Sequence, residues 1–316
     1  MKRTIQLAML LILSLTCLTQ VKAATPIKYE PIPRELFAPC DQKGELVKLD
    51  YDVKEGQKFA FVYLPYGYDE TKKYDVYYVM HGGGDNADFF MGTDKQPSPF
   101  KNVIDNCVKN GDIRPMIIVL PSFYPSPENH GDFAGAAQLT RDFNKELIDY
   151  LIPAVEGKYS TYAETTDRAG IEASRDHRGF GGFSMGGLTT WYVFIDCLDY
   201  VADYTPYSGD CWLYGMKSGV EKGEENAAAI ADVVKNSKYG KDGFRIVAAT
   251  GTKDIAYEPL TGLIEAMKKK TDVFTFTDTL EEGNLHYIVA PDKYHERGAC
   301  SEYIYDCLRL LYPVEK

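Results

Sequence analysis

The 316-residue sequence predicts an α/β fold with a mostly parallel central sheet and helices on both faces. Apolar strand-like runs alternate with helix-like segments along most of the chain, which is the pattern of parallel strands covered on both sides. The stretches "HGGG" and "GFSMGG" both follow such runs, where α/β sheets bind ligands. No repeat or linker divides the chain, so we expect residues 24–316 to form a single domain.

The elements follow in order from the spacing of apolar residues. Two early strands, within residues 44–53 and 58–68, are joined by a turn around Glu55 and Gly56. The remaining strands are expected within residues 74–84, 115–123, 178–183, 200–209, 244–251 and 284–291. The helices are expected within residues 99–109, 143–155, 185–198, 224–235, 259–269 and 301–313.

Residues 1–23 have the pattern of a secretory signal peptide. A basic start precedes an apolar run over residues 7–18, and a small-residue cleavage pattern ends at Ala23. The run is shorter than the ~20 residues that a membrane span needs. Lipid anchoring at Cys17 is the alternative, but Thr16 is a poor match to the small residue that precedes a lipidated cysteine. We therefore expect a secreted or periplasmic protein cleaved after Ala23.

Charge and cysteine content narrow the class further. The formal net charge of −11 disfavours nucleic acid and anionic membranes as partners. Six of the seven cysteines follow the leader. Cys300 and Cys307 are seven residues apart in one expected helix, ~10 Å in space, which is too far for a disulfide. We expect mostly buried thiols, with Cys197 and Cys211 as the first pair to test for a disulfide.

The stretch "RGFGGFSMGG" contains the pattern G-x-S-x-G centred on Ser184. In this pattern, known as the nucleophile elbow of α/β-hydrolases, the serine occupies a strained turn between a strand and a helix. Its neighbours must lack side chains so that the helix can pack against the strand. The flanking residues are strand-like before Ser184 and helix-like after it, so we expect Ser184 to be a nucleophile. The alternative is an idle serine in a glycine-rich turn.

A serine nucleophile needs a base and an acid, which in this fold follow in the order serine, acid, histidine. Only His286 and His295 follow Ser184. His286 lies inside an expected strand, where a half-buried role is common. His295 lies in the loop before the last helix, so it is the expected base.

The acid should lie beyond the strand that precedes the histidine. Asp254 is in the loop after residues 244–251 and is the expected acid. Glu258 and Asp292 are the alternatives, followed by Asp210 after an earlier strand. The other role for Asp254 is that of a helix cap.

The oxyanion of the reaction needs backbone donors. The N–H of Met185, at the start of a helix, is one, and the N–H of Gly83 in the "HGGG" loop is the other, with Gly82 as its alternative. We expect His81 to brace this loop through hydrogen bonds.

The motifs "MHGGGDN", "GFSMGG", "GTKDIAY" and the late "YH" resemble carbohydrate esterase family 1, which includes feruloyl esterases and acetyl xylan esterases. The family belongs to the wider esterase D-like α/β-hydrolases, and the resemblance covers roughly residues 45–313. It implies an α/β-hydrolase fold, the triad Ser184, Asp254 and His295, and hydrolysis of esters on plant polysaccharide. The leading expectation is a secreted feruloyl esterase that releases ferulic acid from arabinoxylan.

Aromatic residues in expected loops are candidates for stacking on a feruloyl ring or a sugar. They are Trp212, Tyr257, Phe89 and Tyr124, although for any single one an ordinary surface role is the favoured interpretation. The segment 212–243 is longer than a plain connection and is expected to contribute to a lid.

Other functions stay open on the sequence. With the same chemistry, an acetyl xylan esterase or a siderophore esterase is the alternative, and a non-catalytic carbohydrate-binding protein is the alternative from another class. No pair of histidines has metal-ligand spacing and no nucleotide-binding glycine loop is present, so we expect no metal and no cofactor.

Overall fold

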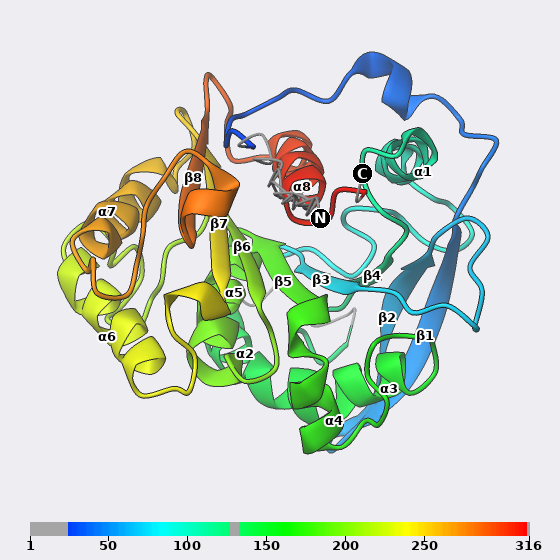
Figure 1. Ribbon diagram of the computed structural model, residues 1–316, viewed down its shortest axis with the longest axis horizontal. Helices are drawn as coiled ribbons and strands as arrows, with labels where there is room; N and C mark the ends of the chain where they lie inside the picture. Colours follow the sequence, from blue (N-terminus) through cyan, green and yellow to red (C-terminus); the bar gives the residue numbers. More distant parts are fainter. Residues whose placement is uncertain (1–24, 127–132, 315–316) are drawn as a thin grey trace, which may run out of the picture.

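The computed structural model describes residues 25–126 and 133–314. The predicted signal peptide and its cleavage site lie outside the described residues. The described chain forms one eight-stranded sheet in the order β1-β2-β4-β3-β5-β6-β7-β8 (Figure 1). The strands are β1 (Glu45–Val53), β2 (Gly56–Leu64), β3 (Val76–Met80), β4 (Ile117–Leu120), β5 (Arg178–Phe183), β6 (Asp203–Tyr207), β7 (Arg245–Gly251) and β8 (Leu285–Ala290).

The sheet is mostly parallel, as predicted. β1 and β2 form an antiparallel hairpin in which Val53 pairs with Gly56, and β2 pairs with β4 in the antiparallel sense. Every pairing from β4 through β3, β5, β6 and β7 to β8 is parallel. The carboxyl ends of these six strands therefore lie along the same edge of the sheet.

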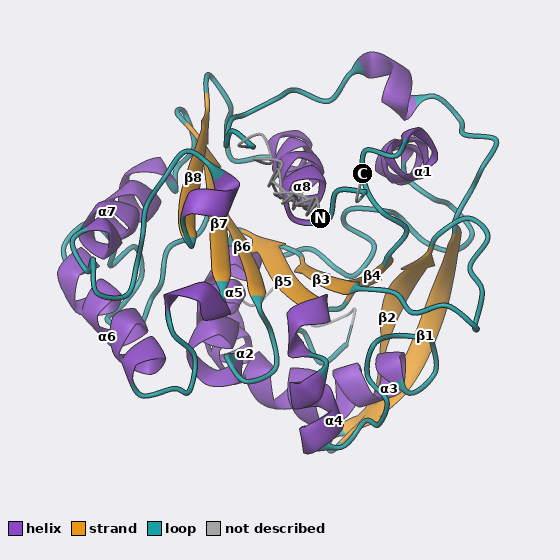
Figure 2. Cartoon of the chain, in the orientation of Figure 1, coloured by secondary structure: helices purple, strands orange, loops and turns teal. Residues whose placement is uncertain are grey.

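Helices cover both faces of the sheet (Figure 2). Alternate residues of β3 show the division: Tyr77 and Val79 belong to a core with α1 and α8, whereas Val76 and Tyr78 belong to a core with α2, α5, α6 and α7. The helices are α1 (Pro99–Asn110), α2 (Phe133–Glu146), α3 (Ile152–Glu156), α4 (Arg168–Ala173), α5 (Met185–Cys197), α6 (Gly223–Lys235), α7 (Tyr257–Lys268) and α8 (Arg297–Leu311).

The helix predicted over residues 143–155 is part of a longer helical run with an irregular turn. α2 ends at Glu146, a π-helical turn spans Leu147–Leu151, and α3 continues the run. Pro153 has no backbone N–H to donate to the preceding turn, so the hydrogen-bond register has to change near it. The apolar spacing predicted the helix but not this change of register.

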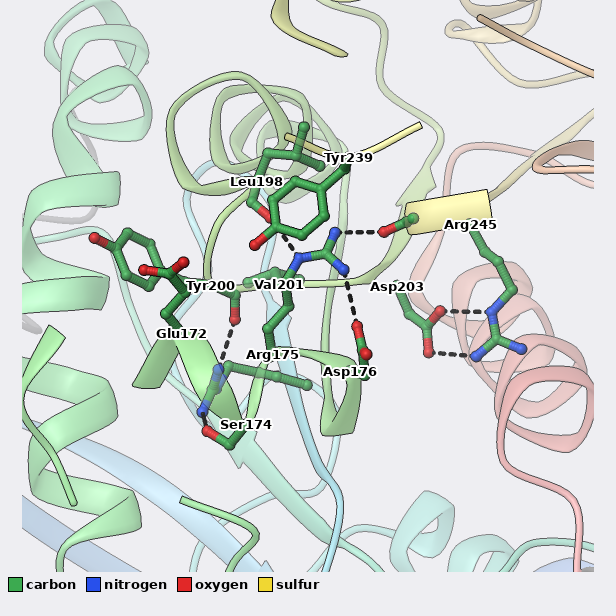
Figure 3. A network of polar contacts seen from close by, with 12 residues as sticks. Glu172, Ser174, Arg175, Asp176, Leu198, Tyr200, Val201, Asp203, Tyr239 and Arg245 are labelled. Carbon is green, nitrogen blue, oxygen red and sulfur yellow. Dashed lines mark hydrogen bonds and ion pairs between the residues drawn. The ribbon is translucent and has the colours of Figure 1, made fainter. Parts of the chain in front are cut away.

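The amino ends of the central strands are fixed by a network of polar contacts (Figure 3). Arg175, just before β5, donates to the carbonyl oxygens of Leu198 and Gly243. Arg245 at the start of β7 makes two bonds to Asp203 at the start of β6, at 2.7 and 2.8 Å. These contacts hold the edge of the sheet opposite to the one that carries the candidate site.

Two further predictions concern cysteines and membranes. All six cysteines of the described chain are buried free thiols, so the suggested disulfide between Cys197 and Cys211 is absent there. Each cysteine side chain is instead buried in the core, which confirms the expectation of mostly buried thiols. Within residues 25–126 and 133–314, no helix has the length and apolar character needed to cross a membrane.

Candidate active site

The loops at the carboxyl ends of five neighbouring strands converge on one point. β5 leads into Ser184, β7 into Asp254, and β8 into His295. β3 leads into the "HGGG" loop, and β6 leads into Ser208, Gly209 and Asp210. This is the ligand-binding edge of an open α/β sheet.

Ser184 occupies a strained turn between β5 and α5. Its backbone φ of 56° lies in the left-handed region, which is costly for a residue with a side chain. Two of the surrounding glycines have a steric role, since a Cβ at Gly182 would come within 2.6 Å of Gly186, and one at Gly186 within 2.3 Å of the Met80 carbonyl oxygen. The glycines therefore let α5 pack close to β5 and β3 while Ser184 stays exposed to the cavity.

The three predicted triad residues are joined by hydrogen bonds. His295 Nε2 lies 2.9 Å from Ser184 Oγ, and His295 Nδ1 lies 2.7 Å from Asp254 Oδ1. An ionised carboxylate only accepts, so Nδ1 carries a proton and Nε2 is left to accept the serine proton. Asp254 is buried at 7% exposure, and the half-buried His295 ring packs on Phe183, with centroids 4.6 Å apart.

Hydrogen bonds with two buried side chains hold the loop after β3 in place. His81 Nδ1 donates to the carbonyl oxygen of Gly82 at 2.7 Å, and Nε2 lies 2.8 Å from Ser122 Oγ. The Tyr124 hydroxyl accepts from Gly84 N at 2.9 Å. His81 thus has the bracing position expected of it. The loop backbone is held so that Gly83 faces the cavity.

A cavity of about 290 Å³ opens beside Ser184. Gly83 and Met185, the predicted oxyanion-hole residues, both line it. As the first residue of α5, Met185 has a backbone N–H without a partner inside the helix. The lining is otherwise largely apolar and includes Trp212, Met216, Ile255, Ala256 and Pro259.

Comparison with known proteins shows which family this chain belongs to. The Esterase family model matches residues 55–286, more than half of the chain. The protein belongs to this esterase family. Endo-1,4-beta-xylanase Y of Acetivibrio thermocellus is 43% identical over 287 residues, which cover 91% of this chain and 25% of the xylanase. The esterase thus spans a quarter of that relative's length.

Solved structures of esterases are also similar to this chain. A serine-to-alanine mutant of the feruloyl esterase module from Clostridium thermocellum, complexed with sinapinate, is 41% identical with a TM-score of 0.80. The match covers 93% of the esterase and 97% of that module. A carbohydrate esterase family 1 ferulic acid esterase from Anaeromyces mucronatus, 22% identical over 89% of this chain and 97% of that one, shares the fold with a TM-score of 0.66. The resemblance to this group of esterases is confirmed.

The structure separates the alternative base and acids from the triad. His286 of β8 is fully buried, and its ring nitrogens lie near the carbonyl oxygens of Thr277 and Gly283. Asp292 is exposed and pairs with Lys253 at 2.8 Å. Asp210 has its own partners in the loop after β6, and Glu258 lies exposed in the first turn of α7.

Only one of the four predicted substrate-stacking aromatics lines the cavity, and it is Trp212. Tyr124 is 1% exposed and bonded to Gly84 N, so its predicted substrate contact is corrected to a bracing role. The Phe89 ring stacks on Phe183, and the Phe183 ring in turn packs on His295. Tyr257 is the first residue of α7 and does not line the cavity.

The esterase also has cavity residues that sequence reasoning missed. Met216 and Ile255 are 61% and 63% exposed and line the cavity. Of the predicted lid segment 212–243, only Trp212, Met216 and Lys217 line the cavity, while α6 packs against α7. A signal was available for Ile255, since it follows the expected acid Asp254 directly.

Proposed function

We propose that this protein is an exported serine esterase that releases ferulic acid, or a closely related phenolic acid, from esterified plant polysaccharide. The observation that carries the proposal is the chain of hydrogen bonds from Asp254 through His295 to Ser184, which ends at an apolar cavity walled by Trp212. The similarity to a feruloyl esterase module complexed with sinapinate supports the choice of acyl group. The leader pattern in residues 1–23 supports export.

In the proposed mechanism, each residue of the site has a step in ester hydrolysis. His295 Nε2 takes the proton of the Ser184 hydroxyl as Oγ attacks the ester carbonyl carbon. The negative charge that develops on the carbonyl oxygen is stabilised by the N–H groups of Met185 and Gly83. Asp254 holds the imidazole in place and stabilises its positive charge.

An acyl-enzyme intermediate divides the reaction into two halves. The proton on His295 Nε2 passes to the departing sugar hydroxyl, which leaves the acyl group bonded to Ser184 Oγ. A water molecule then gives a proton to the same nitrogen and attacks the acyl carbon. The bond between that carbon and Ser184 Oγ breaks, His295 Nε2 returns the proton to Oγ, and the free acid leaves. Because both halves use one base, the whole cycle requires His295 to alternate between neutral and charged forms.

The cavity favours an aromatic acyl group over acetate. Its volume of about 290 Å³ is near the lower end of small-molecule sites, roughly 300–1,000 Å³. An acetyl group would leave most of this space unfilled, whereas a planar phenolic acid can pack against Trp212 and Pro259.

The test is hydrolysis of methyl ferulate beside an acetyl ester by the wild type, Ser184→Ala and the matched control Ser237→Ala. Ser237 follows α6 and lies outside the cavity lining. We expect strong feruloyl turnover in the wild type and the control, with a loss of about 10⁵-fold or more in Ser184→Ala. Activity on the acetyl ester alone would keep the mechanism and replace the substrate. Equal activity in Ser184→Ala would contradict the triad.

A further inference from the structure

Asp210 accepts hydrogen bonds from both ends of the loop between Trp212 and Gly219, which forms one side of the cavity. It follows β6 and is 2% exposed. Its Oδ1 accepts from the indole Nε1–H of Trp212 at 2.8 Å, and its Oδ2 accepts from the backbone N–H of Gly219 at 2.8 Å. One buried carboxylate therefore fixes both a cavity-lining side chain and the point where the loop rejoins the core.

The rest of the loop is built around the same closure. The Ser218 hydroxyl donates to the carbonyl oxygen of Cys211 at 2.8 Å. Gly219 packs so tightly on the first turn of α7 that a Cβ there would lie 1.9 Å from the Pro259 carbonyl oxygen. Between these anchored ends, Met216 and Lys217 reach the cavity. The position of this wall thus depends on contacts made at the base of the loop.

We propose that Asp210 is a positioning residue that sets the acyl-group selectivity of the esterase by holding the indole of Trp212 against the acyl cavity. This inference rests on the proposed function and deepens it. Both partners of Asp210 are N–H donors, so two acceptor oxygens are required. An asparagine at this position supplies one acceptor and turns an NH₂ group toward the other donor.

The first test compares wild type and Asp210→Asn on methyl ferulate and on an acetyl ester. We expect the KM for methyl ferulate to rise roughly tenfold or more, in line with the loss of a bond to a buried charge. The kcat for methyl ferulate and the kcat/KM for the acetyl ester should change less than about threefold, because the triad and oxyanion donors are untouched. An equal loss on both esters, or no change in the ferulate KM, would overturn the proposal.

Two further variants separate positioning from general damage. Trp212→Phe keeps an aromatic ring but lacks the indole N–H, so adding Asp210→Asn to it should raise the ferulate KM by less than the same change does in the wild type. Asp306→Asn is the matched control, since Asp306 is also 2% exposed and accepts a backbone bond, from Glu30 N, outside the cavity. The control should leave the ratio of the two KM values unchanged, and a full additive effect in the double variant would count against the proposal.

A readout without turnover completes the test. The sequence contains two tryptophans, and the other one, Trp191, is fully buried with its own bond to Gly209 O. Asp210→Asn should therefore shift tryptophan emission to longer wavelength and increase quenching by acrylamide, both through Trp212. Partial unfolding would lower kcat per molecule but not raise KM, and titration of active serines with an organophosphate counts the folded sites. A wild type inactive on both esters would overturn the proposed function, and the emission change then decides alone whether Asp210 fixes Trp212.

Discussion

Asp254 Oδ1 accepts two hydrogen bonds, one from His295 Nδ1 at 2.7 Å and one from the backbone N–H of Ala256 at 2.7 Å. The second bond fixes the orientation of the carboxylate from the approach to α7. Oδ2 is buried without a protein partner. A single oxygen atom therefore orients the imidazole, and the backbone of residues 254–256 orients that oxygen.

This relationship predicts different effects for two substitutions of Asp254. Asp254→Ala removes the acceptor, so kcat/KM on methyl ferulate should fall by about 10⁴-fold. Asp254→Asn should retain more activity, because the N–H of Ala256 favours the amide oxygen in the Oδ1 position, which keeps His295 Nδ1 bonded. Steady-state kinetics of both variants, with active-site titration, check this. Equal losses would show that the bond from Ala256 does not orient residue 254.

Gly186→Ala should destabilise the protein by about 1–3 kcal/mol, because the new methyl would overlap the Met80 carbonyl oxygen and force α5 away from β3. The matched control is Gly240→Ala, where a Cβ meets nothing within 4 Å. Urea unfolding of both variants measures the free energies. A loss in Gly186→Ala no greater than in Gly240→Ala would show that the tight approach is not needed.

Asp306 of α8 predicts a pH dependence of stability. Burial raises the pKa of Asp306 to about 7, against the opposing effect of the bond from Glu30 N. Its folded-state pKa is above the unfolded value of about 3.9, so its contribution to stability is complete below pH ~3.9 and is lost as the pH rises through about 7.

Asp306→Asn keeps the acceptor for Glu30 N and cannot ionise. The melting temperature of the variant relative to the wild type should therefore rise by about 2 °C or more between pH 5 and pH 8, and level off above that. Differential scanning calorimetry at constant ionic strength measures this difference. A difference that stays constant with pH would mean that Asp306 titrates in its ordinary range.

The ion pair between Arg178 and Glu156 predicts a large cost for a single deletion. Two bonds of 2.6 and 2.7 Å join the side chains, and both are nearly inaccessible. Arg178→Met should lower the free energy of unfolding by about 3–5 kcal/mol, since it leaves a buried carboxylate unpaired. Arg168→Met, which breaks an exposed pair with Asp149, should cost about 1 kcal/mol or less. Similar costs in urea unfolding would contradict this account.

The sequence was sufficient to predict features that depend on neighbouring positions or on chain order. The elbow at Ser184 was predictable because the close packing of helix on strand requires glycines at fixed positions around the serine, all within five consecutive residues. Asp254 and His295 followed from the order of strands and loops, since each comes directly after a parallel strand and all such strands end at the same edge.

Features that depend on loop closure were not predictable. The direction of the Tyr124 ring is set by its bond to Gly84 N, which the amino-acid type does not reveal. Asp210 reads as an alternative acid in the sequence, because its partners Trp212 and Gly219 meet only when the loop folds back on α7. The π turn before Pro153 is likewise invisible to apolar spacing.

The most direct test of the central claim is to trap the acyl-enzyme. Wild type mixed with excess methyl ferulate and quenched in acid within the first turnover should carry one feruloyl group on the peptide that contains Ser184, identified by mass spectrometry. Ser184→Ala should carry none and should not turn over the ester. A wild type that hydrolyses methyl ferulate without any acyl group on Ser184, or with the group on another residue, would contradict the account.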